Sequence, residues 1–345
     1  LCEKNGIRYC WLCAIHASLC KKEKASTMGE KFIRRDQMES STRFLHAVEM
    51  GVGAWAWGDR IIWNYGGSYD DDDVRSAFDT SLANGIRLVD TAEVYGRGRS
   101  EQLIGKFLKE TDQPVLLATK FMPYPWRIFR RSLLRSLRNS LARLDVEIVD
   151  LYQIHWPIPI VSIETWMGEL ATAVKEGLAR TVGVSNYDQP QMLQAYSALA
   201  RHDVPLASNQ VEYHLLDRRI EKNGLLDRCK ELDVRLIAYS PLAMGLLTGK
   251  YTVDSPPPGM RGRRYGRILP KLPALLKVMT EIGQDQGGKT NAQVALNWCI
   301  SKGTMPIPGA KKASQAEQNA GALGWKLTEE QVVLLDEASD RVMQD

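Results

Sequence analysis

The chain has 345 residues, of which 44% are hydrophobic and 25% are charged, and both fractions are typical of a globular protein. Disordered and fibrous classes are thereby excluded, and the length fits either two ordinary domains or one large α/β barrel. Forty-five Lys and Arg residues against 41 Asp and Glu residues leave a net charge of +4, which is too small to indicate a nucleic-acid partner.

The beginning of the chain differs in composition from the rest. A Cys-x-x-Cys pair, Cys10 and Cys13, could belong to a zinc site, but no second pair follows it. A short apolar run (9–20) precedes a Lys-rich stretch (21–27), as in organelle-targeting sequences, although acidic residues are frequent for such a segment. We predict that residues 1–46 are a disordered or targeting extension and that residues 47–345 form the folded domain.

No stretch reaches the roughly 18 consecutive apolar residues that a membrane span needs. Cys229 and Cys299 stand alone within apolar helical patterns, which favours a reducing compartment over a disulfide-rich secreted fold. We therefore expect a soluble protein of the chloroplast stroma or the cytoplasm.

From about residue 50 onward, short apolar runs alternate with amphipathic helical patterns. Gly, Asp or Pro bounds each run, and each is too short for a helix, so each predicts a strand. A helix is predicted over 129–144, where leucines recur at i, i+3 and i+4. The eight predicted strands are 50–55, 86–89, 115–118, 148–154, 179–184, 206–211, 234–238 and 304–307.

This alternation predicts a parallel sheet covered by helices, and eight units fit a closed (β/α)8 TIM barrel. An open doubly wound sheet is the alternative. Such a sheet usually carries G-x-G-x-x-G when it binds a dinucleotide, and the Gly51/Gly53 and Gly96/Gly98 pairs each lack the third glycine. A long connector (239–304) follows the seventh strand, and connectors of this size are usually functional. Helical patterns continue to the C-terminus.

Polar and reactive side chains close most of the predicted strands. In a parallel barrel these positions converge on one mouth, where the chemistry of such barrels takes place. No metal site is predicted there. The residues at or just beyond the strand ends are Trp55, Asp90, Lys120, His155, Asn186, Gln210, Tyr239 and Lys311.

Four of the residues at this mouth suit proton transfer to a carbonyl oxygen. A phenol has a pKa near 10, and a neighbouring ammonium favours its ionised form. Asp90 would keep Lys120 charged, Lys120 would tune Tyr95 as a proton donor, and His155 would hydrogen-bond the oxygen that receives the proton. The set therefore predicts hydride addition to a carbonyl carbon with protonation by Tyr95.

Two other chemistries are weaker alternatives. A metal-dependent hydrolase would need several histidine and carboxylate ligands at strand ends, and of the five histidines only His155 is so placed. A Schiff-base aldolase would need a desolvated lysine of lowered pKa, whereas Asp90 would hold Lys120 protonated.

The chain also resembles a known family, the aldo-keto reductases, over most of its length. Within that family it looks most similar to the NADPH-dependent reductases of plants and cyanobacteria. Seven strand-end signatures carry the resemblance in order: Asp90-Thr-Ala-Glu-Val-Tyr95-Gly, Ala118-Thr-Lys120, Asp150-Leu-Tyr-Gln-Ile-His155-Trp156, Gly183-Val-Ser-Asn186, Asn209-Gln210-Val-Glu-Tyr213, Ala238-Tyr-Ser-Pro-Leu242 and Pro306-Ile-Pro-Gly-Ala310. The resemblance implies catalysis by Asp90, Tyr95, Lys120 and His155.

The resemblance further implies NADPH lying across the mouth. Ser185, Asn186 and Gln210 would hold the carboxamide, and Tyr239 would stack on the nicotinamide. Substrate would contact Trp55, Tyr95, His155 and Trp156. The full set of cofactor-binding residues expected is Trp55, Ser185, Asn186, Gln210, Tyr239, Ser240, Leu242, Gly245, Lys250, Arg261, Gly309, Lys311, Gln315, Gln318 and Asn319.

Two local charge patterns remain. The segment from Ser314 to Glu317 fits a capping box that opens a helix, and Lys311 before it would oppose the helix dipole unless a phosphate were bound. The acidic run 70–73 precedes a helical pattern, where negative charge favours the dipole, so it does not indicate a metal site. The alternative to a carbonyl reductase is a barrel that binds NADPH as a redox sensor or regulatory subunit with little turnover.

Overall fold

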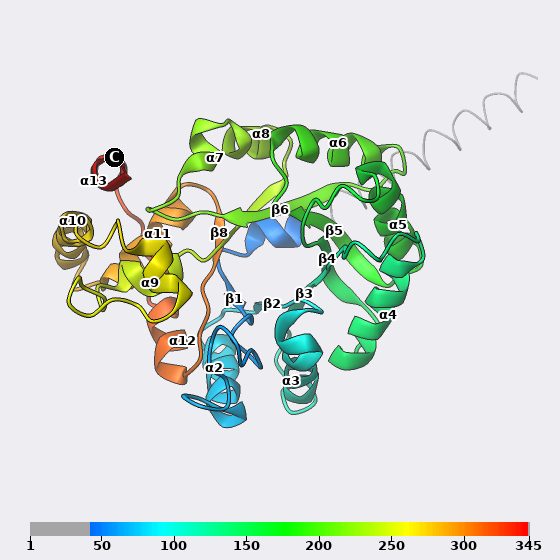
Figure 1. Cartoon of the computed structure of the whole chain (residues 1–345), viewed down its shortest axis with the longest axis horizontal. Helices are drawn as coiled ribbons and strands as arrows, with labels where there is room; N and C mark the ends of the chain where they lie inside the picture. Colours follow the sequence, from blue (N-terminus) through cyan, green and yellow to red (C-terminus); the bar gives the residue numbers. More distant parts are fainter. Residues whose placement is uncertain (1–41, 344–345) are drawn as a thin grey trace, which may run out of the picture. The chain divides into compact units, whose positions relative to one another are not determined.

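Eight parallel strands form one sheet in the order of the sequence, from β1 to β8. The computed structural model describes residues 42–343. Each strand overlaps one of the eight predicted runs, so the predicted barrel is confirmed (Figure 1). The strands are β1 (Gly51–Gly53), β2 (Leu88–Asp90), β3 (Leu116–Phe121), β4 (Val149–Ile154), β5 (Ala179–Ser185), β6 (Leu206–Glu212), β7 (Arg235–Tyr239) and β8 (Met305–Ile307).

The sheet closes at the seam between β1 and the end of β8. Gly53 donates its backbone N–H to the carbonyl of Pro308 at 3.0 Å and forms a parallel bridge with Gly309. A Cβ on Gly53 would lie 2.9 Å from the carbonyl oxygen of Ile307, closer than side chains tolerate. Glycine is therefore required for the backbones to approach and for the ring to close.

Helices surround this ring of strands, as Figure 1 shows. They separate consecutive strands, as expected for crossover connections in a parallel sheet. Two short 3₁₀ segments, η1 (Tyr95–Gly98) and η2 (Ala243–Thr248), follow β2 and β7. The α-helices are α2 (Asp71–Ala83), α3 (Arg99–Leu108), α4 (Ser132–Leu144), α5 (Ile163–Lys175), α6 (Gln189–Ala200), α7 (Arg219–Lys222), α8 (Leu225–Glu231), α9 (Met260–Tyr265), α10 (Leu272–Asp285), α11 (Asn291–Ser301), α12 (Ala313–Ala320) and α13 (Glu329–Met343).

The leucine pattern of α4 buries one face of that helix, as predicted. Leu133, Leu137 and Leu144 are fully buried, and each such side chain contributes about 1.5–3 kcal/mol by leaving water. The helix begins at Ser132, three residues later than predicted, because Phe129 is 72% exposed and belongs to the loop.

The acidic run before α2 caps that helix, as expected. The Asp70 side chain accepts hydrogen bonds from the N–H groups of Asp72 and Asp73, and the Asp73 side chain accepts from the N–H of Asp70. Among residues 42–343, no group of His, Cys, Asp and Glu is arranged to hold a metal.

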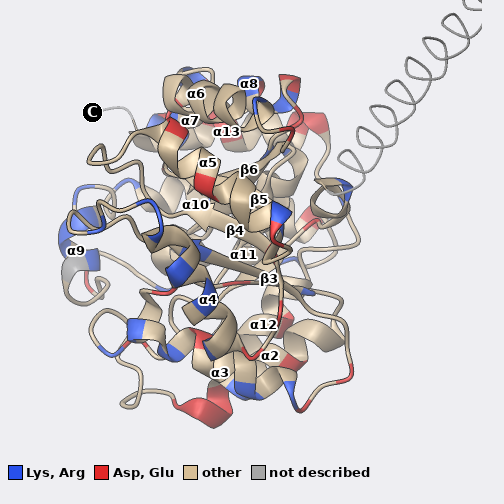
Figure 2. Cartoon of the chain, turned by 90° about the vertical axis from the view of Figure 1, so that its right-hand side faces the viewer, with Lys and Arg blue, Asp and Glu red and all other residues tan. Residues whose placement is uncertain are grey.

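The connection between β7 and β8 is the long segment that the sequence predicted. It contains η2, α9, α10 and α11, and α12 and α13 follow β8. Lys and Arg gather at α9 and its neighbouring loops, as Figure 2 shows. Within the described part of the chain, no helix is long and apolar enough to cross a bilayer.

The chain divides between Phe44 and Leu45, and everything described below belongs to the second unit. The interpretations of Cys10, Cys13 and the Lys-rich stretch fall on residues outside the described range. The boundary at residue 46 remains a prediction.

Candidate active site

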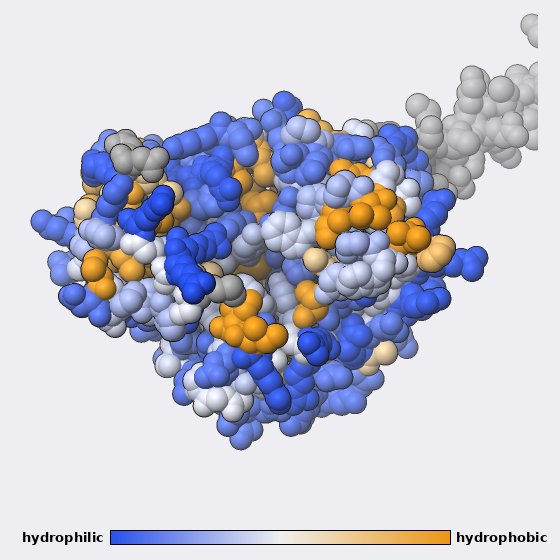
Figure 3. All heavy atoms as spheres, viewed as in Figure 1, coloured by the Kyte–Doolittle hydropathy of each residue, from blue (hydrophilic) through white to orange (hydrophobic). Residues whose placement is uncertain are grey.

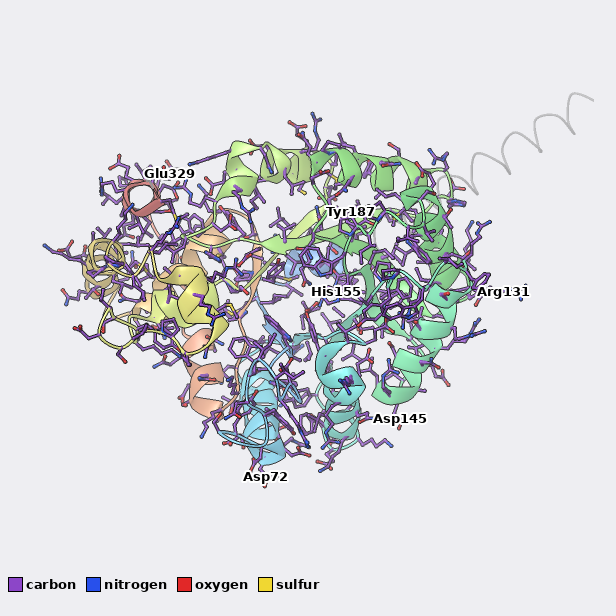
Figure 4. The ribbon with its side chains drawn as sticks, in the orientation of Figure 1. Asp72, Arg131, Asp145, His155, Tyr187 and Glu329 are labelled. Carbon is purple, nitrogen blue, oxygen red and sulfur yellow. The ribbon has the colours of Figure 1, made fainter. Side chains whose placement is uncertain are left out.

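The carboxyl ends of β2, β3 and β4 bring three of the four predicted catalytic residues together. Asp90 ends β2, Lys120 is the fifth residue of β3, and His155 follows β4. Because the strands are parallel neighbours, their carboxyl ends meet at one rim. His155 lies toward the centre of the ring of strands in Figure 4.

Lys120 and Asp90 form a buried ion pair. The side chain of Lys120 is completely buried and that of Asp90 is 2% exposed. An ammonium has three N–H donors, and Lys120 Nζ has three acceptors: Asp90 Oδ1, the Thr91 carbonyl at 2.8 Å and the Tyr95 hydroxyl at 3.5 Å. Because all three N–H donors have an acceptor, the lysine can be buried here, whereas an unpaired buried charge costs several kcal/mol.

Tyr95 is held at this ion pair by a tight turn after β2. Gly96 has φ of 55°, and a Cβ there would lie 2.6 Å from the carbonyl oxygen of Gly58 in the loop after β1. The Tyr95 ring packs edge-on against His155 at 5.7 Å and tilted against Trp55 at 6.2 Å. The phenol therefore stands between the lysine, the imidazole and the indole.

Burial dominates the proton affinities of this group. It raises the pKa of Tyr95 well above 10, and the negative charge of Asp90 raises it further. This is the opposite of the tuning expected from Lys120, whose own pKa is lowered by burial despite the attraction of Asp90. Burial, and then the charge of Lys120, lowers the pKa of His155 to about 3. At neutral pH, Tyr95 therefore carries a proton and His155 is uncharged.

Two amides hold the other oxygen of Asp90. Gln210 Nε2 donates to Asp90 Oδ2 at 2.8 Å, and Gln153 Nε2 donates to the same atom at 3.4 Å. Gln210 was predicted to hold the cofactor carboxamide, and Gln153 was not predicted as a site residue. The signal for Gln153 was its place two residues before His155, since alternate residues of a strand share a face.

The predicted carboxamide site is assembled by hydrogen bonds between strands β5, β6 and β7. Asn186 Nδ2 donates to the His155 carbonyl at 3.0 Å and to Ser185 Oγ at 3.0 Å. The Tyr239 hydroxyl donates to Asn186 Oδ1 at 2.9 Å, and Ser185 Oγ donates to the Gln210 carbonyl at 2.9 Å. These predicted residues are therefore brought together, next to His155.

Two predicted cations, Arg261 and Lys311, lie against the loop after β1, and a third, Lys250, is close enough to Lys311 to act on its pKa. Lys311 Nζ donates to the Trp63 carbonyl at 3.2 Å and lies 4.6 Å from the centre of the Trp63 ring. The Arg261 guanidinium lies 5.3 Å from the same ring centre. Burial and the charges of Arg261 and Lys250 lower the pKa of Lys311 to about 8.

Asp59 is the carboxylate whose charge acts on Lys311, raising its pKa, but no ion pair within 4 Å joins a carboxylate to any of these three cations among the described residues. Trp63 Nε1 is buried beside them and has no hydrogen-bond partner within the described chain. Trp63 was not predicted, and its only sequence signal was its position in a Trp-rich loop. The arrangement is suited to an anion.

The capping box predicted from Ser314 is wrong. Helix α12 begins at Ala313 with Lys312 as N-cap, and no side chain caps it. Gln315 Oε1 instead accepts the backbone N–H of Lys311 at 2.8 Å, which rigidifies the approach to the helix. The first N–H groups of α12 thus lack a side-chain acceptor.

The remaining residues predicted to bind cofactor or substrate lie outside the clusters described above. Ser240 has a positive φ of 51° at the start of the loop after β7, Leu242 precedes η2, and Gly245 lies beside Lys250 Nζ. Asn319 Nδ2 donates to the Gly309 carbonyl at 3.4 Å. The backbone carbonyl of Gln318 accepts a hydrogen bond from Gln293 Nε2 at 3.1 Å, and Trp156 is 44% exposed.

A parallel (β/α)8 barrel with polar side chains converging at the carboxyl ends of its strands defines a protein of the TIM-barrel enzyme class. The sequence profile described as "Aldo/keto reductase family" matches residues 49–340. The chain belongs to this family of NADP(H)-dependent oxidoreductases.

Named relatives are similar over most of their length. Pyridoxal reductase, chloroplastic, from Arabidopsis thaliana is 43% identical over 309 residues, covering 86% of this chain and 84% of the relative. Among solved structures, a glycerol dehydrogenase from Gluconobacter oxydans aligns with a TM-score of 0.75 and 30% identity, covering 86% of this chain and 93% of that one. An aldo/keto reductase from Klebsiella pneumoniae, solved with NADP and acetate, aligns with a TM-score of 0.66 and 28% identity, covering 84% and 90%.

Proposed function

We propose that this protein reduces an aldehyde or ketone to an alcohol, with NADPH as hydride donor and Tyr95 as general acid. The observation that carries the proposal is the buried Lys120 ammonium, paired with Asp90 and 3.5 Å from the Tyr95 hydroxyl. A proton donor whose conjugate base meets a fixed positive charge is suited to protonating a developing alkoxide.

The residues present fit NADPH. Arg261 and Lys311 lie over the Trp63 ring, and Lys250 is close enough to Lys311 to lower its pKa, so positive charge gathers here as suits a phosphate group. Lys311 would hold the 2′-phosphate, Lys250 and Arg261 would hold phosphate groups beside it, and Ser185 and Asn186 would hold the carboxamide. The bound cofactor would supply hydride for the carbonyl carbon.

The protein's own residues would perform the proton chemistry. His155, uncharged because its pKa is about 3, donates one hydrogen bond to the carbonyl oxygen and polarises it. Tyr95 then gives its proton to the same oxygen as the negative charge develops there. Lys120 stabilises the phenolate that remains, and water returns the proton to Tyr95 after the alcohol leaves. Asp90 keeps Lys120 charged and in position.

A pyridoxal-like aromatic aldehyde is the first substrate to examine. The Arabidopsis relative is named a pyridoxal reductase and is 43% identical. The predicted substrate residues Trp55, Tyr95, His155 and Trp156 are aromatic, and their rings suit a planar heterocycle.

The test is turnover followed by the loss of NADPH absorbance with pyridoxal and a panel of simple aldehydes. Tyr95→Phe removes the proton donor and keeps the ring, so we expect at least a 100-fold loss of kcat with unchanged NADPH affinity. Tight NADPH binding without turnover of any carbonyl would refute the proposal and favour the sensor.

We also propose that residues 1–46 contain a targeting segment that directs the chain to the chloroplast. The supporting observation is the name of the Arabidopsis relative, which is described as chloroplastic. A fluorescent protein carrying residues 1–46 at its N-terminus should accumulate in chloroplasts. Accumulation in the cytoplasm would show that the segment has another role.

A further inference from the structure

The loops that follow β3 and β4 expose more apolar surface than the proton chemistry requires. Trp126 is 70% exposed and Phe129 is 72% exposed in the first loop, and Trp156 and Ile160 are 44% and 52% exposed in the second. Figure 3 shows apolar patches set among hydrophilic surface on the face that it views. Apolar surface gathered in loops at one end of a barrel indicates a ligand with apolar area of its own.

A two-point ion pair fixes the first of these loops. Arg127 Nη1 contacts Glu93 Oε1, and Arg127 Nη2 donates to Glu93 Oε2 at 3.2 Å. Both partners also hold Met122: Arg127 Nη1 donates to its carbonyl at 2.9 Å, and Glu93 Oε1 accepts its N–H at 2.7 Å. A bidentate pair fixes orientation as well as distance, so this loop is pinned to the segment that carries Tyr95.

The guanidinium of this pair lies within a stack of aromatic rings. Arg127 lies 5.0 Å from the ring centre of Phe121, the last residue of β3, and 5.3 Å from that of Tyr124. Tyr124 stacks on Trp126, with centres 4.6 Å apart and an angle of 7° between the planes. The four side chains form one ladder that leads from a buried strand end to an exposed indole.

The ladder begins at the level of the candidate active site. Glu93 precedes Tyr95 by two residues. On the other side, the Phe121 carbonyl accepts the backbone N–H of His155 at 2.9 Å. A rigid wall therefore starts beside the two residues that would act on the carbonyl oxygen and extends outward to Trp126.

We propose that Glu93 and Arg127 are positioning residues that hold Tyr124 and Trp126 as a stacking wall, and that this wall selects carbonyl compounds bearing a planar aromatic ring. The inference rests on the proposed carbonyl reduction and specifies its substrate class. The indole face would contact the ring of the substrate, whereas a small aliphatic aldehyde would reach Tyr95 without touching the wall.

The test compares the reduction of 2-naphthaldehyde and propanal by the full chain with saturating NADPH. Trp126→Ala removes the outer ring and, at 70% exposure, does not threaten folding. We expect its KM for 2-naphthaldehyde to rise roughly 3- to 10-fold, which corresponds to the loss of one aromatic contact. The KM and kcat for propanal should be unchanged. Arg127→Met should likewise raise the KM for 2-naphthaldehyde and leave that for propanal unchanged. Arg127→Lys keeps the positive charge but cannot form the bidentate pair with Glu93, so its KM for 2-naphthaldehyde should lie between those of Arg127→Met and the wild type. Arg131→Met, an exposed position of the same segment, is the matched control.

The outcomes separate this inference from the proposed function. Equal KM increases for both aldehydes would refute the proposal that the wall selects aromatic substrates. A loss of kcat that is equal for both aldehydes and comes with a shifted pH profile would also refute it, since Glu93 and Arg127 would then act on Tyr95. An Arg131→Met variant with the same selective rise in KM would also overturn it. A wild-type protein that reduces neither aldehyde nor pyridoxal would remove the proposed function and this inference with it, whereas turnover with unchanged ratios in all variants overturns only the inference.

Discussion

Replacing Lys311 by Met tests the phosphate site most directly. Met keeps much of the apolar stem of Lys311 and removes the charged Nζ, which lies 4.6 Å from the centre of the Trp63 ring and 4.5 Å from that of Tyr69. A hydrogen bond to a charged group contributes about 1.5–3 kcal/mol, or about 10- to 150-fold in Kd. Because Lys250 and Arg261 remain nearby, we expect the lower part of that range, about 10- to 50-fold weaker NADPH binding. NADH, which lacks the 2′-phosphate, should bind almost as before.

The pH dependence of binding gives this prediction a second readout. Burial and two neighbouring cations lower the pKa of Lys311 to about 8 in the free protein. A bound phosphate dianion reverses that repulsion and favours the ammonium, so NADPH binding takes up a proton once the pH exceeds about 8. The affinity for NADPH should therefore fall as pH rises from 8 to 10, whereas the affinity for NADH should not follow.

The assay is fluorescence titration of both cofactors between pH 7 and 10. Lys312→Met is the matched control, since Lys312 is the next residue, is half exposed and has a partner in Asp73 at 3.7 Å. Equal weakening of NADPH and NADH by Lys311→Met would refute the assignment. So would a Lys312→Met variant with the same loss, because any nearby cation would then suffice.

Three further predictions concern stability. Gly168→Ala in α5, where a Cβ would meet no atom closer than 3.6 Å, should raise the free energy of unfolding in urea by about 0.5–1 kcal/mol. Gly105→Ala in α3, whose Cβ would lie 2.6 Å from a backbone oxygen, should lower it by about 1–3 kcal/mol. Equal effects of the two substitutions would show that the helices adjust freely. Asp90→Asn should lower the free energy of unfolding by about 3–5 kcal/mol, because it leaves Lys120 charged and buried without its partner. The double variant Asp90→Asn with Lys120→Met should regain much of that loss. Losses of unfolding free energy that simply add in the double variant would contradict the pairing. His155 takes up a proton near pH 6.5 in the unfolded state and only near pH 3 in the folded state. The free energy of unfolding should therefore fall as the pH drops from 6.5 to 3, by up to about 1.4 kcal/mol per pH unit from this group. His155→Gln should make stability depend less steeply on pH over this range.

The strand pattern and the strand-end residues were predictable because both are local. Runs 148–154 and 179–184 differ from β4 and β5 by one residue, since a short apolar run between polar breakers has few other stable conformations. Asp90, Lys120 and His155 could be placed together because parallel strands put their carboxyl ends on one side. The motifs then identified the family, which the match over residues 49–340 confirms.

Other features depend on residues far apart in the sequence. Gln210 donates to Asp90 across 120 positions, and the Glu93–Arg127 pair joins two loops 34 residues apart. The cap of α12 was mispredicted because a capping box describes only four residues, whereas the start of that helix depends on how its loop leaves β8.

The amino-acid sequence alone determined the period of the barrel, the kinds of side chain at its mouth and therefore the class of reaction to expect. Only the tertiary structure decided how those side chains behave. Burial raises the pKa of Tyr95 and lowers that of His155, and the charge of Asp90 acts on Tyr95 in the same direction as burial. The reason is physical: desolvation and charge interactions depend on distances through space, and the order of residues in the chain does not contain those distances until it has folded.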